Sequence, residues 1–271
     1  MRRRWAILLL GLALVGCASE PPVPSAEPAR RIVSLVPSFT EILFSLGAGD
    51  RVVAVTENDT FPPEAARLPR VGDLQPDYER ILALRPDLVV GDPGLQGPQL
   101  ERLRHLGVPV LSLESQSLEG LRQALGELGR ATGTTERATA LQQAMEAQIR
   151  SHQAHRRPAP PRVFVEIWDK PLMTCGAGTY VHELVTLAGG QNLYADLSGH
   201  PAVSSEDLVR RQPDLIVLTI GTPEEAARRP GWSSLRAVQK GRIHRIDPDL
   251  LVRPTPRFPQ ALDLLSGWFF P

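Results

Sequence analysis

The chain has 271 residues, of which 42% are hydrophobic and 22% are charged, a composition that suits a globular protein with a substantial core. Its 30 basic and 30 acidic side chains balance, so no global field draws it to nucleic acid or to an anionic membrane, and nucleic-acid binding is not expected. With only two cysteines, Cys17 and Cys175, the chain has no intramolecular disulfide if one of them carries a lipid.

The N-terminus has the pattern of an export signal. A basic start at 1–4 is followed by an apolar run at 5–15, which is too short to span a membrane, and Gly16 stands directly before Cys17. A cysteine after a small residue resembles a bacterial lipoprotein signal. The resemblance implies a signal peptide at 1–16 and a lipid on Cys17 as the first mature residue. The alternative is an uncleaved anchor or a plain secretory signal.

Residues 17–29 are expected to form a flexible tether, because this segment is rich in proline, serine and alanine and has no apolar period. The folded body is expected to begin near Arg30. What remains is long enough for one large domain or for two lobes of about 120 residues each.

Strands and helices alternate in the first half of the body. Apolar runs and spacing predict strands at 31–35, 51–55, 88–90 and 108–113, and helices at 38–46 and 99–106. Ser38 and Glu41 have the spacing of a capping box, which predicts that they cap the helix that Gly47 ends. Such alternation predicts a parallel sheet covered by helices on both faces.

A long helical pattern follows, from 118 to 155, and Gly133 interrupts it. Its second helix would span about 30 Å and act as a stiff strut between two α/β halves. The alternative is an ordinary surface helix of one continuous domain. On the first interpretation, we expect an N-terminal lobe at 30–133, a connecting helix at 134–157 and a C-terminal lobe at 158–271.

The second half repeats the alternation. Strands are predicted at 162–167, 215–218 and 242–246, and helices at 180–188, 232–238 and 256–269. The fold class expected is α/β, with two Rossmann-like lobes whose parallel sheets are joined by one long rigid helix.

Two segments of the chain repeat one another. Glu79 stands seven residues before the Pro-Asp-Leu at 86–88, and Glu206 stands seven residues before the one at 213–215. Each copy predicts a short helix, a proline break and a buried strand, with the glutamate exposed near the start of the helix. The repeat suggests two similar lobes, although Pro-Asp-Leu is also a common connection between a helix and a strand in α/β proteins.

The sequence lacks the common motifs of catalysis. It contains no nucleophile elbow, phosphate-binding loop or dinucleotide fingerprint. His182-Glu183 lacks the second histidine of a zinc protease, because Thr186 stands at that spacing. The lone Cys175 is typical of a small buried hydrophobe. An enzyme is therefore the weaker hypothesis, and no catalytic cofactor is expected.

The order of signal, tether, two α/β halves and strut resembles the substrate-binding lipoproteins of metal-chelate ABC importers, and most closely the cobalamin-binding family. Its most specific stretches are 31–41, 61–63 with 70–72, the two repeated segments, 187–193 and 253–257. The resemblance implies capture of a metal chelate, cobalamin or another corrinoid, and its delivery to an importer permease and its ATPase. We expect a monomer, anchored in the bacterial cell envelope through Cys17, on the periplasmic side or on the outer face of the cytoplasmic membrane.

In that family a glutamate on each lobe docks onto arginines of the permease. The matching residues here are Glu79 and Glu206. Charge pairing at two separated points would orient the binding protein over the permease and steer their encounter. The alternative for each glutamate is a favourable charge near a helix N-terminus.

The resemblance places the ligand in a cleft between the lobes, where the strand ends and the loops beyond them supply its contacts. The candidates are Phe39, Asn58, Phe61, Trp168, His200, Asp249 and Arg253. Aromatic rings would pack against a corrin, and Asp249 and Arg253 would reach its amide side chains. Phe61 and Trp168 could instead be core residues, and Arg253 could simply pair with Asp249.

The sequence departs from the cobalamin binder at the cleft. Asn58 and His200 fall where that family has aromatic residues, and Asp73-Leu74 lacks its tryptophan. This loss of aromatic residues favours another corrinoid, haem or a ferric siderophore as alternatives to cobalamin. His200 is a candidate axial ligand to cobalt or iron, because neutral imidazole is a common metal ligand, or else a solvated loop side chain. No other metal ligand is predicted.

Overall fold

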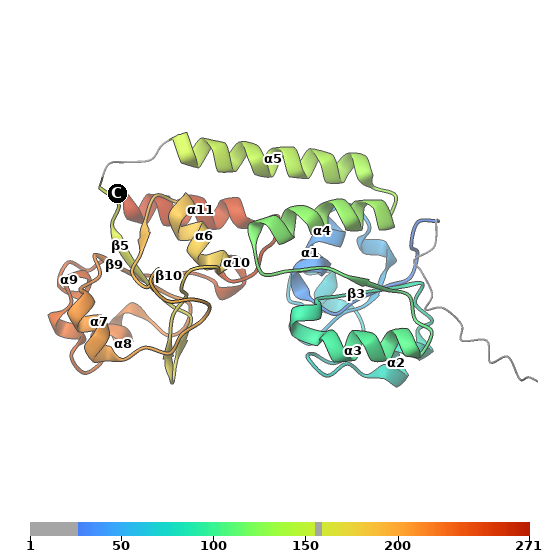
Figure 1. Cartoon of the computed structure of the whole chain (residues 1–271), viewed down its shortest axis with the longest axis horizontal. Helices are drawn as coiled ribbons and strands as arrows, with labels where there is room; N and C mark the ends of the chain where they lie inside the picture. Colours follow the sequence, from blue (N-terminus) through green and yellow to red (C-terminus); the bar gives the residue numbers. More distant parts are fainter. Residues whose placement is uncertain (1–26, 155–158) are drawn as a thin grey trace, which may run out of the picture.

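The computed structural model describes residues 27–154 and 159–271. They form two α/β lobes, each built on a four-stranded sheet, with strand orders β2-β1-β3-β4 and β10-β9-β5-β8 (Figure 1). All pairs in both sheets are parallel, which confirms the expected fold class. The signal peptide, Cys17 and residues 17–26 of the predicted tether lie outside the described residues.

The first lobe surrounds the sheet nearer the N-terminus. Its strands are β1 (Ile32–Ser34), β2 (Val52–Ala54), β3 (Leu88–Gly91) and β4 (Val110–Ser112). Its helices are α1 (Pro37–Ser45), α2 (Tyr78–Ala83), α3 (Pro93–His105) and α4 (Leu118–Ala131), with short 3-10 turns η1 (Gly49–Arg51) and η2 (Ala65–Arg67). Strand β3 is buried along its whole length, as expected for a parallel strand covered on both faces.

The second lobe has the same plan with a small hairpin added. Its sheet contains β5 (Arg162–Glu166), β8 (Gln191–Asn192), β9 (Leu215–Leu218) and β10 (Ile243–Arg245). The hairpin pairs β6 (Trp168–Asp169) with β7 (Leu172–Met173). The helices are α6 (Tyr180–Leu187), α7 (Ser205–Arg211), α8 (Pro223–Ala227), η3 (Trp232–Ser234), α9 (Arg236–Gln239), α10 (Pro248–Leu251) and α11 (Phe258–Phe269).

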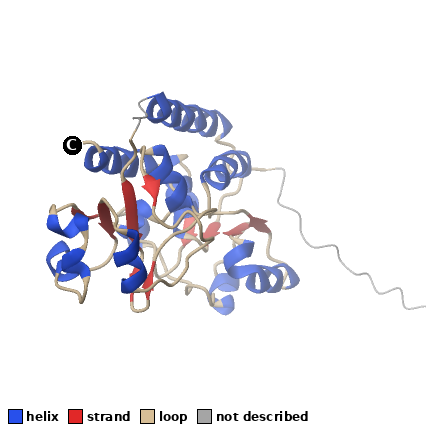
Figure 2. Cartoon of the chain, turned by 60° about the vertical axis from the view of Figure 1, so that its left-hand side comes forward, coloured by secondary structure: helices blue, strands red, loops and turns tan. Residues whose placement is uncertain are grey.

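Helix α5 (Thr135–Ala154) joins the lobes. It has 20 residues and runs along the top of both lobes in Figure 1, where it packs on α4 of the first lobe and on α6 and α11 of the second. Figure 2 shows helices packed around the sheets of both lobes. None of the described helices is long and apolar enough to cross a membrane.

One hydrophobic core runs through both lobes on the side of α5. It contains Ile32 and Leu43 of the first lobe, Val163 and Leu265 of the second, and Met145 of α5. Two smaller clusters are confined to one lobe each, on the other side of each sheet. Separating the lobes would expose the shared core to water, at a cost of about 25 cal/mol for each Å² of apolar surface.

The predicted capping box of the first helix is wrong. Helix α1 begins at Pro37 after Val36, and no side chain caps it, because a proline at the first position presets the helical φ and needs no amide partner. Glu41 is buried and instead binds Arg257 of the second lobe.

Two other predicted helices differ at their boundaries. Helix α3 begins at Pro93 rather than at 99, and Asp92 caps it by accepting a hydrogen bond of 2.7 Å from the Gly94 amide. The prolines and glycines of this segment hide the helical pattern in the sequence. The helix predicted at 232–238 is divided into η3 and α9 at Leu235, whose backbone is extended.

Candidate ligand-binding and docking sites

The loops that follow the strand ends bring the two lobes together. The hydroxyl of Thr60, in the loop after β2, donates a hydrogen bond of 2.8 Å to Oδ2 of Asp249, in α10 after β10. Ligands of open α/β sheets bind beyond the carboxyl ends of the strands. This junction therefore marks the region in which a ligand shared by the lobes would lie.

Three predicted site residues meet at this junction. Asp249 pairs with Arg253 through Oδ1 and Nη2, 2.9 Å apart, which is the alternative role considered for Arg253. The Arg253 Nη1 is buried and has no hydrogen-bond partner among the described residues. Phe61, next to Thr60, is 40% exposed. A carboxylate and a guanidinium thus stand side by side, and the residue that follows Thr60 carries an exposed aromatic ring.

The other predicted residues are spread over both lobes. Asn58 is exposed and donates a hydrogen bond of 2.7 Å to Oδ2 of Asp73. Trp168 is 52% exposed, and its indole Nε1 donates to the carbonyl of Lys170 within its own hairpin. His200 is exposed in the loop before α7. Across the described residues, no hydrogen bond or ion pair joins Trp168 or His200 to the first lobe.

Phe39 was expected in the cleft but is buried in the core. Its side chain is 1% exposed and belongs to the core that the lobes share. As the third residue of α1, it lies on the buried face of the helix with Ile42 and Leu43. Because no surface remains for a ligand, Phe39 leaves the candidate set.

Sequence reasoning missed three exposed apolar residues near the strand ends. Leu74 lies in the long connection between β2 and α2 and is 54% exposed, Leu95 lies in the first turn of α3, after β3, and is 47% exposed, and Val252 directly follows α10 and is 40% exposed. With Phe61 and Trp168 they make up five of the eight large apolar side chains exposed among the described residues. We call these five residues the apolar rim. All five lie in segments that leave the carboxyl end of a strand, which is the signal that a search of the sequence could have used.

Two buried carboxylates carry bidentate arginine partners. Glu41 of α1 accepts two hydrogen bonds of 2.7 Å from Arg257, which precedes α11. Glu166, at the end of β5, is paired with Arg229 in the same manner. Burial raises the pKa of Glu166, and the hydrogen bonds from Arg229 oppose that shift. Arg257 and Arg229 thus compensate charges that would be costly alone.

The repeated glutamates occupy matching places in the two lobes. Glu79 is in the first turn of α2, which precedes β3, and Glu206 is in the first turn of α7, which precedes β9. Strands β3 and β9 each pair with the first strand of their lobe. Both side chains are exposed. The duplication in the sequence is therefore also a duplication in space.

The two glutamates differ in their local contacts. Among the described residues, the Glu79 carboxylate makes no hydrogen bond or ion pair. The backbone amide of Glu206 and the hydroxyl of Ser204 lower the pKa of the Glu206 carboxyl. Both carboxyl groups are exposed, so a cationic partner can reach them.

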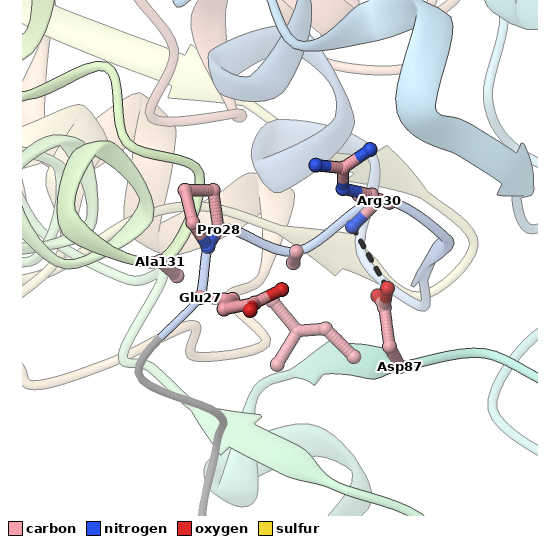
Figure 3. A pocket seen from close by; sticks show the side chains of 7 residues that line it. Glu27, Pro28, Arg30, Asp87 and Ala131 are labelled. Carbon is pink, nitrogen blue, oxygen red and sulfur yellow. Dashed lines mark hydrogen bonds between the residues drawn. The ribbon is translucent and has the colours of Figure 1, made fainter.

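A separate cavity of about 260 Å³ lies at the opposite, amino-terminal end of the first sheet. Glu27, Pro28, Arg30, Asp87 and Ala131 contribute to its lining (Figure 3). The Arg30 amide donates a hydrogen bond of 2.9 Å to Oδ2 of Asp87, and the cavity is thus bordered by the start of the folded body. It is not part of the junction between the strand-end loops.

The described residues contain no group of three or more His, Cys, Asp or Glu side chains that could hold a metal ion. The role of His200 as an axial ligand remains a prediction.

Two α/β lobes bridged by one helix, with exposed apolar and charged side chains where their strand-end loops meet, define a two-lobed substrate-binding protein. The chain belongs to the periplasmic binding protein family, whose model matches residues 32–250. It is thus related to the binding components of ABC transporters.

Relatives of the chain share most of its length. The uncharacterized ABC transporter substrate-binding lipoprotein YvrC of Bacillus subtilis is 32% identical over 264 residues, which cover 94% of this chain and 84% of YvrC. The periplasmic vitamin B12-binding protein BtuF of Vibrio cholerae has a crystal structure with a TM-score of 0.80 and 30% identity, over 89% of this chain and 97% of that one. The structure of the periplasmic haem-binding protein RhuT of Roseiflexus sp. RS-1, in its apo form, has a TM-score of 0.81 and 31% identity, over 89% of this chain and 98% of that one.

Proposed function

We propose that this protein captures a corrinoid, with cobalamin as the first candidate, at the junction of its lobes and delivers it to an ABC importer. The observation that carries the proposal is the apolar rim, because its five exposed side chains come from both lobes and all lie in segments that leave the carboxyl end of a strand. A large planar ligand with apolar faces and a polar edge matches such a rim beside Asp249 and Arg253. The vitamin B12-binding relative supports the same ligand class.

Haem or a ferric siderophore is the alternative ligand. The likeness to a haem-binding protein favours haem, and so does the replacement of family aromatics by Asn58 and His200. His200→Ala tests ligation, because loss of an axial imidazole would shift the absorption bands of the bound chelate. Unshifted bands would show that His200 is not a metal ligand.

The proposed ligand class can be tested by spectral titration of the full chain in detergent with cyanocobalamin, dicyanocobinamide, haemin and ferric siderophores. We expect one of these to bind in a one-to-one complex without being altered. A dissociation constant of about 10 μM corresponds to about −7 kcal/mol, which a large ligand in such a site should exceed. If none of the four binds more tightly than that, the proposal fails.

We further propose that Glu79 and Glu206 dock onto cationic side chains of the permease, which works with its own ATPase. Their matching exposed positions support this role. The double charge reversal Glu79→Arg and Glu206→Arg should abolish uptake and leave ligand affinity unchanged. The matched control is Glu136→Arg, since Glu136 is also exposed in the first turn of a helix but lies on α5. Equal loss of uptake in the control would refute the assignment.

We also propose that a lipid on Cys17 anchors the protein to the cell envelope. The protein is proposed to be a monomer, with lobes at 30–133 and 158–271. The supporting observation is the lipoprotein pattern of the sequence, and YvrC is named a lipoprotein. Labelling cells with a radioactive fatty acid should mark the wild type and not Cys17→Ser. An unlabelled wild type would contradict the anchor.

A further inference from the structure

Arg257 joins the lobes through a bidentate ion pair with Glu41. Its Nε and Nη2 donate to the two carboxylate oxygens of Glu41, each at 2.7 Å. Glu41 is 2% exposed on α1 of the first lobe, whereas Arg257 precedes α11 of the second. A bidentate pair of this kind holds the plane of the guanidinium group as well as its position.

The same guanidinium group covers one face of Phe61. The Cζ of Arg257 lies 4.0 Å from the centroid of the Phe61 ring, well within the range of a cation–π contact. Phe61 remains 40% exposed, so the contact leaves much of the ring open to solvent. The preceding residue, Thr60, is held by its hydrogen bond to Asp249. The ring is therefore fixed by its chain and by the cation against it.

We propose that Arg257 is a positioning residue for ligand capture, which holds the Phe61 ring in the orientation that a ligand meets. This inference rests on the proposed function, because it takes Phe61 to be part of the ligand site. Pre-setting the ring removes the entropy that a free side chain would lose on binding. The arrangement needs arginine, since lysine offers neither a planar face nor a bidentate bond.

The molecule contains a matched control for this arrangement. Arg229 makes the same bidentate bond to a buried glutamate, Glu166, and its Cζ lies 4.7 Å from the centroid of the Trp232 ring. Trp232 is fully buried, so its ring has no face to offer a ligand. Arg229→Lys should thus affect stability much as Arg257→Lys does, without affecting ligand affinity.

The positioning of Phe61 can be tested without any ligand. The full chain, labelled with 4-fluorophenylalanine at its seven phenylalanines, is measured by fluorine NMR in detergent, and the Phe61 signal is assigned by its loss in Phe61→Leu. We expect Arg257→Lys to shift and sharpen the Phe61 signal, as the ring gains freedom, whereas Arg229→Lys leaves it in place. An unchanged Phe61 signal in Arg257→Lys would overturn the proposal.

The consequence for capture is tested by a double-mutant cycle with cyanocobalamin, or with haemin if the wild type binds that probe instead. Arg257→Lys should weaken binding roughly threefold to tenfold in the wild type and have little effect in Phe61→Leu, because the ring it positions is gone. An equal loss of affinity in both backgrounds would assign Arg257 a purely structural role.

A second variant guards against misfolding. Leaving Glu41 buried without its partner is strongly destabilising, so Glu41→Gln with Arg257→Met removes both charges together. We expect this variant to fold, with the same loss of affinity as Arg257→Lys, and wild-type affinity would overturn the proposal. If the wild type binds none of the four chelates named above, the proposed function fails and the ligand part of this inference with it, whereas the fluorine spectra still decide whether Arg257 holds Phe61.

Discussion

Cys175 is fully buried, and burial raises the pKa of its thiol to about 12. A thiol reacts as its thiolate, so at pH 8 both protonation and burial protect it. In Cys17→Ser, which leaves Cys175 as the remaining cysteine, we expect no reaction with a thiol reagent in the native state and one reactive thiol after denaturation. Fast stoichiometric labelling of the native protein would show that the thiol is accessible.

Asp59 gives a second prediction at the residue scale. The carboxyl is buried beside the strand-end loop, and its burial raises its pKa above 3.8, although the Thr56 amide and hydroxyl donate to it at 2.8 and 2.6 Å. A group with a raised folded pKa stabilises the fold below its unfolded pKa, and this contribution is lost as the pH rises through the folded pKa.

The direction of this pH dependence can be checked with Asp59→Asn, in which the side chain at position 59 does not titrate. We expect the unfolding free energy of the wild type, relative to that of Asp59→Asn, to fall between pH 4 and pH 7 (about the range above the ordinary pKa of aspartate). Urea unfolding of both proteins at the two pH values measures this difference. A difference that rises with pH would show that the folded state lowers the pKa of Asp59 and would contradict the prediction.

Single residues also show where sequence reasoning loses the site. The sequence indicates that Phe61, Asp249 and Arg253 follow strand ends, and the structure brings them together. It cannot tell the exposed Leu74 from the buried Phe39, because both are apolar residues in segments that leave the carboxyl end of a strand. Exposure is decided by what other elements cover, which a local pattern does not contain.

At the scale of elements, long patterns were predicted better than short ones. The strands β3 and β9 were recognisable from their uninterrupted apolar runs, and the helix α5 was recognisable from its length of 20 residues. Helices α8 and α10 have only five and four residues, too few for a helical period. The hairpin β6–β7 has two residues in each strand, too few to show an alternation of apolar and polar residues, and it was missed.

Helix α5 provides the prediction at this scale. Met145 is 6% exposed in the core that α5 shares with both lobes. We expect Met145→Ala to lower the unfolding free energy by about 2 kcal/mol or more, because it leaves a cavity, and Met145→Leu to cost less than about 1.5 kcal/mol. Urea unfolding followed by fluorescence measures both changes. Equal stability of the alanine variant and the wild type would mean that α5 packs loosely on the lobes.

At the scale of the whole molecule, the lobes are connected by more than one helix. The shared core, the bond between Glu41 and Arg257, and the bond between Thr60 and Asp249 all cross from one lobe to the other. A third polar contact joins them where Glu183 of α6 accepts a hydrogen bond of 2.8 Å from the Leu118 amide of α4. These connections hold the strand-end loops of the two lobes at one junction. The sequence suggests the two lobes, but not the continuity of their core.

The most direct test of the account asks whether a ligand contacts the apolar rim. Cyanocobalamin is titrated into the wild type, Leu74→Ala and Trp168→Ala, with Leu264→Ala as the control, because Leu264 is 42% exposed on α11 and outside the rim. The account predicts one-to-one binding that each rim substitution weakens roughly tenfold, about 1.4 kcal/mol, and that the control leaves unchanged. Binding that is equally strong in the rim variants and the control would contradict it.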